Sequence, residues 1–164
     1  MSKKIAYKRH AHYYLTRLDK YNQQYIIGGA EIDNALRGYD NDSQQVMLGQ
    51  ERALFYADDD AELAEMVEDY ADYGADILLL RMEILTYQNW VEHALRFSKQ
   101  LQLRRAECVH HGNLGIVQRQ LRQWEQAIAN LKQAYELATA LNANELMGLW
   151  IGNLGNIYLD MGEY

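Results

Sequence analysis

The sequence predicts an all-α fold in which antiparallel helical hairpins stack into a solenoid. The 164-residue chain contains no proline, although average usage of about 5% would give about eight, and proline is the strongest helix breaker. Its apolar residues recur at the three- and four-residue spacings of amphipathic helices. The word Gly-Asn-Leu-Gly occurs at 112–115 and again at 152–155. A 40-residue period of this kind is the signature of a stacked repeat protein.

Residues 1–60 are expected to form a divergent N-terminal region of helical hairpins. One face of its first helix carries residues spaced by three and four, and we expect core packing there in preference to a planar ligand: Tyr7, Ala11, Tyr14, Leu18, Tyr21 and Tyr25. The pair Gly28-Gly29 should end this helix. A short helix at 30–36 and a turn-rich linker at 38–42 follow, and Ser43 is a candidate N-cap for the next helix.

Residues 61–164 are expected to hold about two and a half repeats: a degenerate one at 61–103, a clear one at 106–141 and a truncated one at 145–164. The acidic run 58–60 suits a helix start. The connections are short, which makes successive helices antiparallel, and we expect these helices at 61–85, 88–103, 106–121, 124–141 and 145–161. Tyr164 stands where the second helix of its repeat should begin, so we expect a piece of a longer protein.

Composition argues against several classes of partner. The net charge of −7 disfavours direct binding of nucleic acid or of an anionic membrane surface. The longest apolar run, 77–80, is far shorter than the roughly 20 residues that span a bilayer. Cys108 is the only cysteine, and it is expected to be a small buried residue. These observations predict a cytoplasmic protein.

Nothing in the sequence predicts an enzyme, a cofactor or a metal site. His10, His12 and the pair His110-His111 lack a recognisable ligand spacing. Neither a serine-nucleophile motif nor a phosphate-binding loop occurs. Several acidic residues could pose as catalytic acids, but their helical spacing predicts a solvated face: Glu62, Glu65, Glu68, Asp69 and Asp72.

The segment 112–127, followed by Leu131, Ala134 and Tyr135, resembles a tetratricopeptide repeat. The glycine at 115 would let two helices approach closely, and alanines at 127 and 134 are small where helices cross. The 40-residue spacing is similar to the long repeats of kinesin light chains and spindle-orientation adaptors. Arg122 departs from the family pattern, which usually has glycine in the turn. The resemblance implies a right-handed solenoid with a concave groove.

The family's groove binds a peptide, a protein segment or a small-molecule signal, and its first-helix positions supply the contacts. By register these positions, with the repeated asparagines, are Asn113, Ile116, Arg119, Gln120, Gly152, Asn153, Asn156 and Asp160. Gly112 and Leu149 also fall on that side, and glycines there would leave room for a guest main chain. For Asn113 and Asn153 we prefer a structural tie between neighbouring helices, so Asn156 and Arg119 are the better candidates for contact with a guest. Self-association through the open C-terminal repeat face is a further possibility.

A second resemblance concerns residues 9–42. The run Arg9-His10-Ala11-His12-Tyr13-Tyr14-Leu15, a glycine at 28, Ala35-Leu36 and an Asp-rich turn are similar to the segment before the sensor repeats of bacterial STAND-class signalling ATPases. This resemblance implies the sensor part of such an ATPase or of a transcriptional regulator. The chain has no phosphate-binding loop, so the nucleotide chemistry would lie outside it. A repeat protein made to study folding, without any ligand, is a third possibility.

Overall fold

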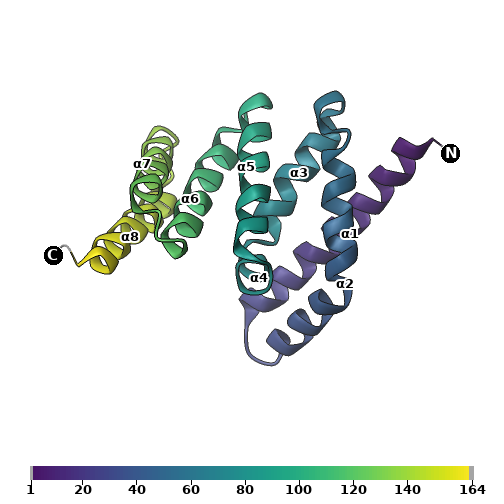
Figure 1. The fold of residues 1–164 in the computed structure, drawn as a ribbon, viewed down its shortest axis with the longest axis horizontal. Helices are drawn as coiled ribbons and strands as arrows, with labels where there is room; N and C mark the ends of the chain where they lie inside the picture. The colour runs from purple at the N-terminus through teal and green to yellow at the C-terminus, as the bar shows by residue number, and fades with distance from the viewer. Residues whose placement is uncertain (1, 163–164) are drawn as a thin grey trace. The chain divides into compact units, whose positions relative to one another are not determined.

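A computed structural model describes residues 2–162, and all of their regular secondary structure is helical (Figure 1). The chain divides after Phe97 into two compact units, called here unit 1 and unit 2. Unit 1 holds α1 (Lys3–Ile27), α2 (Glu31–Leu54), the 3-10 helix η1 (Ala57–Asp59), α3 (Ala61–Tyr73), α4 (Ala75–Arg81) and most of α5 (Ile84–Gln100). Unit 2 holds α6 (Arg104–Gln120), α7 (Trp124–Ala140) and α8 (Asn144–Met161).

Helices α1 and α2 form an antiparallel hairpin. Gly28 and Gly29 adopt positive φ angles of 81° and 61° and reverse the chain, as the sequence predicts. The predicted stripe on α1 faces the core: Ala11, Leu18 and Tyr21 are buried, and the other three positions are partly buried. The core interpretation of the stripe is therefore confirmed.

The predicted linker at 38–42 is wrong, because α2 runs through it without a break. Gly38 is a contact residue, since a β-carbon there would lie 2.3 Å from Cε1 of Tyr21. Ser43 is not an N-cap, because its hydroxyl donates to the carbonyl of Asp40 within the same helix. Packing against α1 therefore outweighs the local turn propensity of Gly, Asp and Asn, and residues 38–42 remain helical.

The single helix predicted at 61–85 is two helices, α3 and α4, which meet at Gly74. A β-carbon on Gly74 would lie 2.8 Å from Cδ2 of Leu18, so close packing against α1 accompanies the break. The predicted start is right: the Asp60 carboxylate accepts a hydrogen bond from the Leu63 amide at 3.3 Å and caps α3. Glu83 caps α5 in the same way, accepting from the amides of Leu85 and Thr86.

Turns of one geometry recur every 20 residues in unit 2. Their middle residues adopt left-handed φ angles of 59°, 58° and 52° at Gln102, Arg122 and Asn142. In each turn the next residue donates its N–H to a carbonyl five positions earlier, as Gln123 does to Gln118 at 2.8 Å. This is the Schellman motif that ends helices. Gly162, 20 residues after Asn142, also has a positive φ, of 76°. The backbone geometry of the turns therefore repeats every 20 residues, which is half of the 40-residue sequence period.

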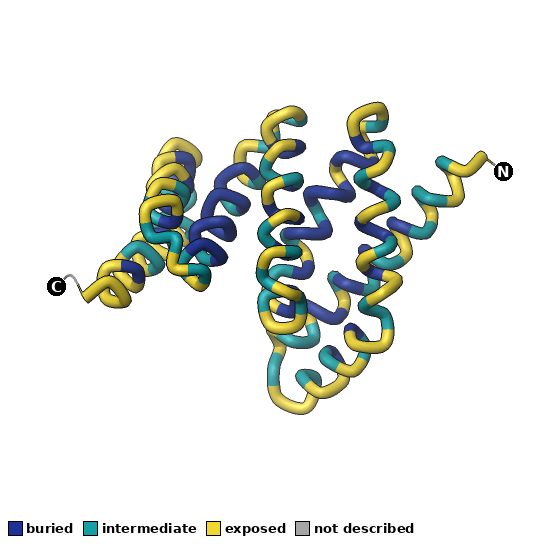
Figure 2. Tube along the Cα trace, in the orientation of Figure 1, coloured by how far each residue is buried: buried dark blue, intermediate teal, exposed yellow. Residues whose placement is uncertain are grey.

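The core of unit 2 lies where α7 packs against both α6 and α8. Helix α6 is buried along most of its length (Figure 2). Gly115 permits its approach to α7, since a β-carbon there would lie 2.5 Å from Cγ of Leu131. Ala127 and Ala134 are fully buried at the same crossing. The predicted roles of these three small residues are confirmed.

Candidate functional site

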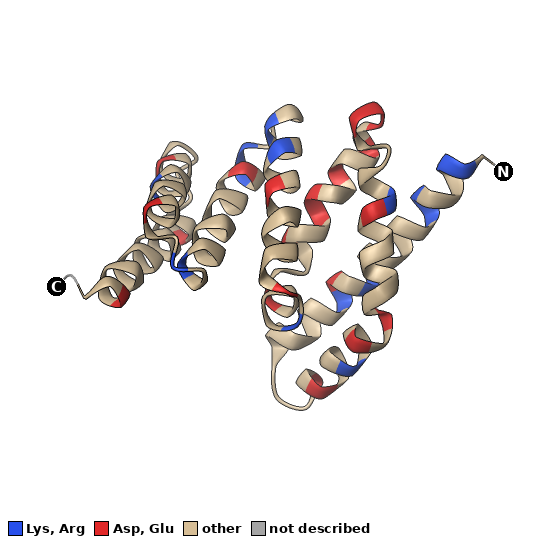
Figure 3. Ribbon diagram, viewed as in Figure 1, with Lys and Arg blue, Asp and Glu red and all other residues tan. Residues whose placement is uncertain are grey.

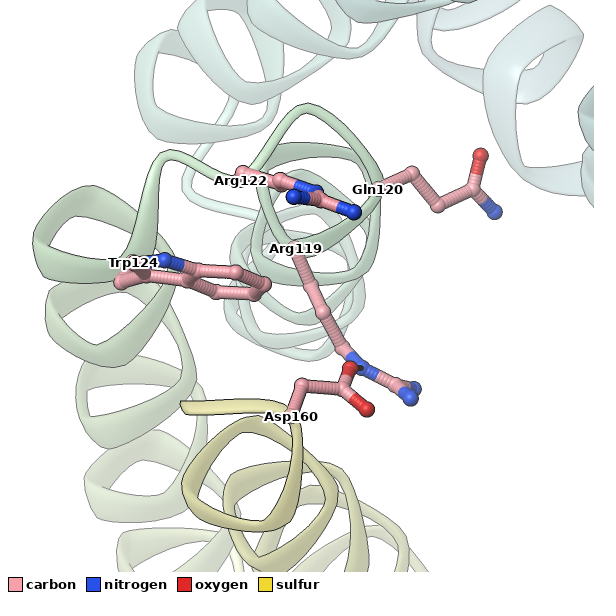
Figure 4. A pocket seen from close by; sticks show the side chains of 5 residues that line it. All are labelled: Arg119, Gln120, Arg122, Trp124 and Asp160. Carbon is pink, nitrogen blue, oxygen red and sulfur yellow. Dashed lines mark hydrogen bonds and ion pairs between the residues drawn. The ribbon is translucent and has the colours of Figure 1, made fainter. Parts of the chain in front are cut away.

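A pocket of about 570 Å³ opens in unit 2 between the last turns of α6 and α8. Three of the residues predicted for the groove line it, namely Arg119, Gln120 and Asp160. Arg122 from the α6–α7 turn and Trp124 from the first turn of α7 complete the lining (Figure 4). The structure thus brings together residues from both copies of the 40-residue repeat.

Arg119 and Asp160 form an ion pair that joins the two copies. The Arg119 Nε donates to a carboxylate oxygen of Asp160 at 2.6 Å. Both side chains are about a third exposed, at 31% and 41%, so the pair contributes less than about 1 kcal/mol to folding. Its main effect is positional, because it holds the Arg119 guanidinium beside Asp160 at the end of α8 (Figure 4).

Arg122 and Trp124 were not among the residues predicted for the groove. Arg122 occupies the left-handed position of its turn, and the turn carries its exposed side chain over the pocket (Figure 4). Trp124 packs against the core of unit 2 and also presents part of its indole to the pocket. An arginine at 122, where tetratricopeptide repeats usually have glycine, was the sequence signal that could have identified Arg122.

The predicted asparagines lie in three different environments. Asn113 is buried, and its amide nitrogen has no hydrogen-bond partner among the described residues. Asn153 donates to the carbonyl of Leu149 at 3.0 Å, so this bond stays within α8 and does not tie two helices. Asn156 is exposed. None of the three lines the pocket at the ends of α6 and α8.

Gly112 leaves no room for a guest main chain, contrary to the prediction. A β-carbon on it would lie 2.2 Å from Cη2 of Trp150, because the indole of α8 covers this glycine. Its copy, Gly152, has no atom within 4 Å of such a β-carbon. Ile116 is partly buried against the unit 2 core, and Leu149 is exposed.

All of the net negative charge belongs to unit 1. Residues 1–97 carry ten Lys or Arg against 17 Asp or Glu, whereas residues 98–164 carry six of each. Helix α3 holds many of the acidic side chains (Figure 3). The pocket of unit 2 therefore belongs to a neutral part of the chain, and two of its five lining residues are arginines.

The predicted solvated face of α3 is only partly right. Glu62 and Glu65 are exposed, but Glu68 is buried. Burial and the charge of Glu68 raise the pKa of the Asp69 carboxyl to about 7. Glu62, Glu65 and Asp69 also line a second pocket, of about 350 Å³, between α1 and α3. Helical spacing alone could not show that α1 covers this side of α3.

Two of the histidines and the cysteine have polar contacts with other helices, namely His10, His111 and Cys108. His10 Nε2 lies 3.0 Å from the side-chain oxygen of Gln45, and His111 Nδ1 lies 2.7 Å from that of Asn130. Cys108 is fully buried, as predicted, and its thiol donates to the carbonyl of Ala134 at 3.2 Å. Among residues 2–162, no three His, Cys, Asp or Glu side chains are grouped so that they could hold a metal ion.

The described helices include none with the length and apolar character that crossing a bilayer requires. Comparison with family models, with curated proteins and with solved structures finds no match.

Proposed function

We propose that the protein is a binding scaffold of tetratricopeptide type, and that unit 2 takes a carboxylate-bearing peptide segment in the pocket between α6 and α8. The observation that carries this proposal is the convergence of Arg119, Arg122, Trp124 and Asp160 around one cavity of about 570 Å³. Peptide and ligand sites commonly have about this volume and combine an apolar wall with a few placed polar groups.

The chemistry of the lining favours an anionic group. A guanidinium presents parallel N–H donors that match a carboxylate. Asp160 engages Arg119, whereas Arg122 is exposed beside the pocket. Arg122 would therefore bind the guest carboxylate, and Arg119, held by Asp160, would bind guest carbonyl groups. The indole of Trp124 offers an apolar surface for a neighbouring side chain of the peptide.

Selection from a displayed library of 12-residue peptides, followed by fluorescence anisotropy on the selected peptides, tests the proposal. Arg122→Ala should weaken the selected peptides about tenfold to a hundredfold, as expected for loss of a charge-assisted hydrogen bond, and Arg119→Ala should weaken them less. Arg105→Ala is the matched control, since Arg105 is an exposed arginine of α6 outside this pocket.

Two further results bear on where the peptide binds. Asn156→Ala would lower the affinity only if the peptide extends along α8 beyond the pocket, because Asn156 is exposed but does not line it. If Arg122→Ala, Arg119→Ala and the unsubstituted protein bind the peptides with equal affinity, the peptide does not bind in this pocket. Circular dichroism on each variant keeps loss of fold apart from loss of binding.

A further inference from the structure

The pocket between α6 and α8 has three charged side chains in its lining. Arg119 and Arg122 are positive, and Asp160 is negative. Gln120 and Trp124, which complete the lining, are uncharged. Two positive charges against one negative leave the pocket with a net charge of +1. Unit 2 as a whole is neutral, so the lining itself sets this small balance.

The two guanidinium groups of the pocket differ in what they contact. The Arg119 Nε donates to a carboxylate oxygen of Asp160 at 2.6 Å. The guanidinium of Arg122 has no hydrogen-bond or ion-pair partner among residues 2–162 and does not reach this carboxylate (Figure 4). A guest anion would therefore meet one arginine whose charge is neutralised and one whose charge is not.

The ends of the helices make the surroundings of the pocket more negative. The carbonyl groups in the last turn of a helix carry about half a negative charge. Helix α6 ends at Gln120, but α7 begins shortly afterwards at Trp124, and its positive end offsets this charge. Helix α8 ends at Met161, next to Asp160, and adds its own partial negative charge. The positive potential of the pocket is therefore weak, so that one negative charge matches it and two exceed it.

We propose that Asp160 sets the charge of this pocket, so that it takes a singly charged carboxylate and discriminates against a doubly charged phosphoryl group. The inference rests on the proposed function, because it specifies the guest of the same pocket. A phosphoserine carries about 1.5 to 2 negative charges at pH 7, and an acidic neighbour repels it. The anchor of the partner peptide is therefore a carboxylate, and phosphorylation of a serine at that point would not replace it.

Asp160 acts here through its charge on Arg119. If Asp160 is replaced by asparagine, the shape of the side chain is kept and the net charge of the pocket rises from +1 to +2. Both arginines would then be available to a dianion, which guanidinium groups bind well. Asp160→Glu keeps the charge and should keep the preference for a carboxylate.

Two small probes of different charge test the inference without a selected peptide. We would titrate the isotopically labelled protein with N-acetylglutamate N-methylamide and with N-acetyl-O-phosphoserine N-methylamide, at about pH 7.5, where the phosphate is doubly charged. The NMR shift of the Trp124 indole N–H, assigned with Trp124→Phe, gives each dissociation constant. The glutamate probe should bind about fivefold more tightly than the phosphoserine probe, and Asp160→Asn should reverse this preference.

Glu145→Gln is the matched control. Glu145 is the other acidic residue of α8, exposed in its first turn and outside the pocket, so its substitution should leave both dissociation constants unchanged. The effect of Asp160→Asn should also shrink at high salt, because salt screens exposed charges.

The outcomes separate this inference from the proposed function. If both probes shift the Trp124 resonance but Asp160→Asn leaves their ratio unchanged, or Glu145→Gln changes it equally, Asp160 does not set the selectivity and the pocket remains an anion site. If neither probe shifts the resonance, the pocket binds no anion, and both the proposed function and this inference are overturned.

Discussion

Leu131 of α7 occupies the space that a side chain on Gly115 of α6 would need, with its Cγ only 2.5 Å from the position of a β-carbon there. The distance is shorter than any ordinary carbon contact, so the pairing of these helices depends on the absence of a side chain at 115. The copy of this residue, Gly155, has no neighbour of that kind. A side chain at this repeated position would therefore clash with Leu131 in α6, but it would meet no neighbour in α8.

Alanine substitution at the two glycines should change stability in opposite directions. Gly115→Ala should lower the free energy of unfolding by about 1 to 3 kcal/mol, because it overpacks the α6–α7 contact. Gly155→Ala should raise it by about 0.5 to 1 kcal/mol, since alanine is the better residue in an exposed helix interior. Urea unfolding of both variants by circular dichroism gives the comparison, and changes of the same sign would contradict the difference in packing between the two glycines.

A second glycine pair is the control for that result. Gly112 lies under the Trp150 indole, whereas Gly152 is open. Gly112→Ala should therefore be destabilising and Gly152→Ala should not. If Gly112→Ala proves neutral while Gly115→Ala is destabilising, the indole moves aside more easily than Leu131 does.

The clear repeat was the part of the fold that sequence could predict best. The helices at 106–121 and 124–141 agree with α6 and α7 to within two residues at each end, because helical periodicity and short turns are local signals. The same signals gave wrong predictions at Gly38 and Gly74, because Tyr21 and Leu18 pack on these glycines from another helix. A glycine that breaks a helix and a glycine that receives a neighbour look alike in one sequence.

Glycine should stabilise the 20-residue turns where a less suitable residue holds the left-handed conformation. Gln102→Gly and Arg122→Gly should each raise the free energy of unfolding by about 1 kcal/mol, because left-handed backbone costs other residues roughly 1 to 2 kcal/mol. Asn142→Gly should gain less, since asparagine tolerates this conformation. Thermal unfolding of the three variants tests the order.

Gln120→Gly is the matched control for the turns. It places the same residue in the last turn of α6, where glycine costs up to about 1 kcal/mol. A gain in stability from Gln120→Gly would show that the effect of glycine is not specific to the left-handed positions.

The candidate site was predictable only in part. Arg119, Gln120 and Asp160 follow from the repeat register, and the structure places them around one pocket. Arg122 and Trp124 enter it through the conformation of one turn, which the register does not describe. The pKa of Asp69 was beyond sequence analysis, because the burial that raises it depends on helices distant in the chain.

Asp69 should make stability depend on pH. Its pKa is raised from 3.8 to about 7 in the folded chain, so the folded state retains a proton that the unfolded state loses between these values. The contribution of Asp69 to the free energy of unfolding therefore falls as pH rises from about 4 to about 7. Asp69→Asn should remove this slope and stabilise the protein by on the order of 2 kcal/mol at pH 8.

Glu51→Gln separates this effect from a general relief of acidic repulsion. Glu51 is an exposed residue of α2 and is not among the charges that act on Asp69, so its substitution should leave the pH dependence nearly unchanged. Urea midpoints measured between pH 4 and pH 8 provide both comparisons. An Asp69→Asn variant whose stability follows that of the unsubstituted protein at every pH would exclude the carboxyl as the source.

The thiol of Cys108 should react only when unit 2 opens. The side chain is fully buried between α6, α7 and α8, where it donates to the Ala134 carbonyl and accepts from the Trp150 indole N–H. Burial also raises the pKa of the thiol, which lowers the population of the reactive thiolate. Labelling by a disulfide reagent at pH 8 should therefore be at least a hundredfold slower than in 6 M urea.

Gly115→Ala, which loosens the same helix contact, should speed the labelling, whereas Gly155→Ala should not. Equal rates in native and denaturing buffer would contradict the burial of Cys108.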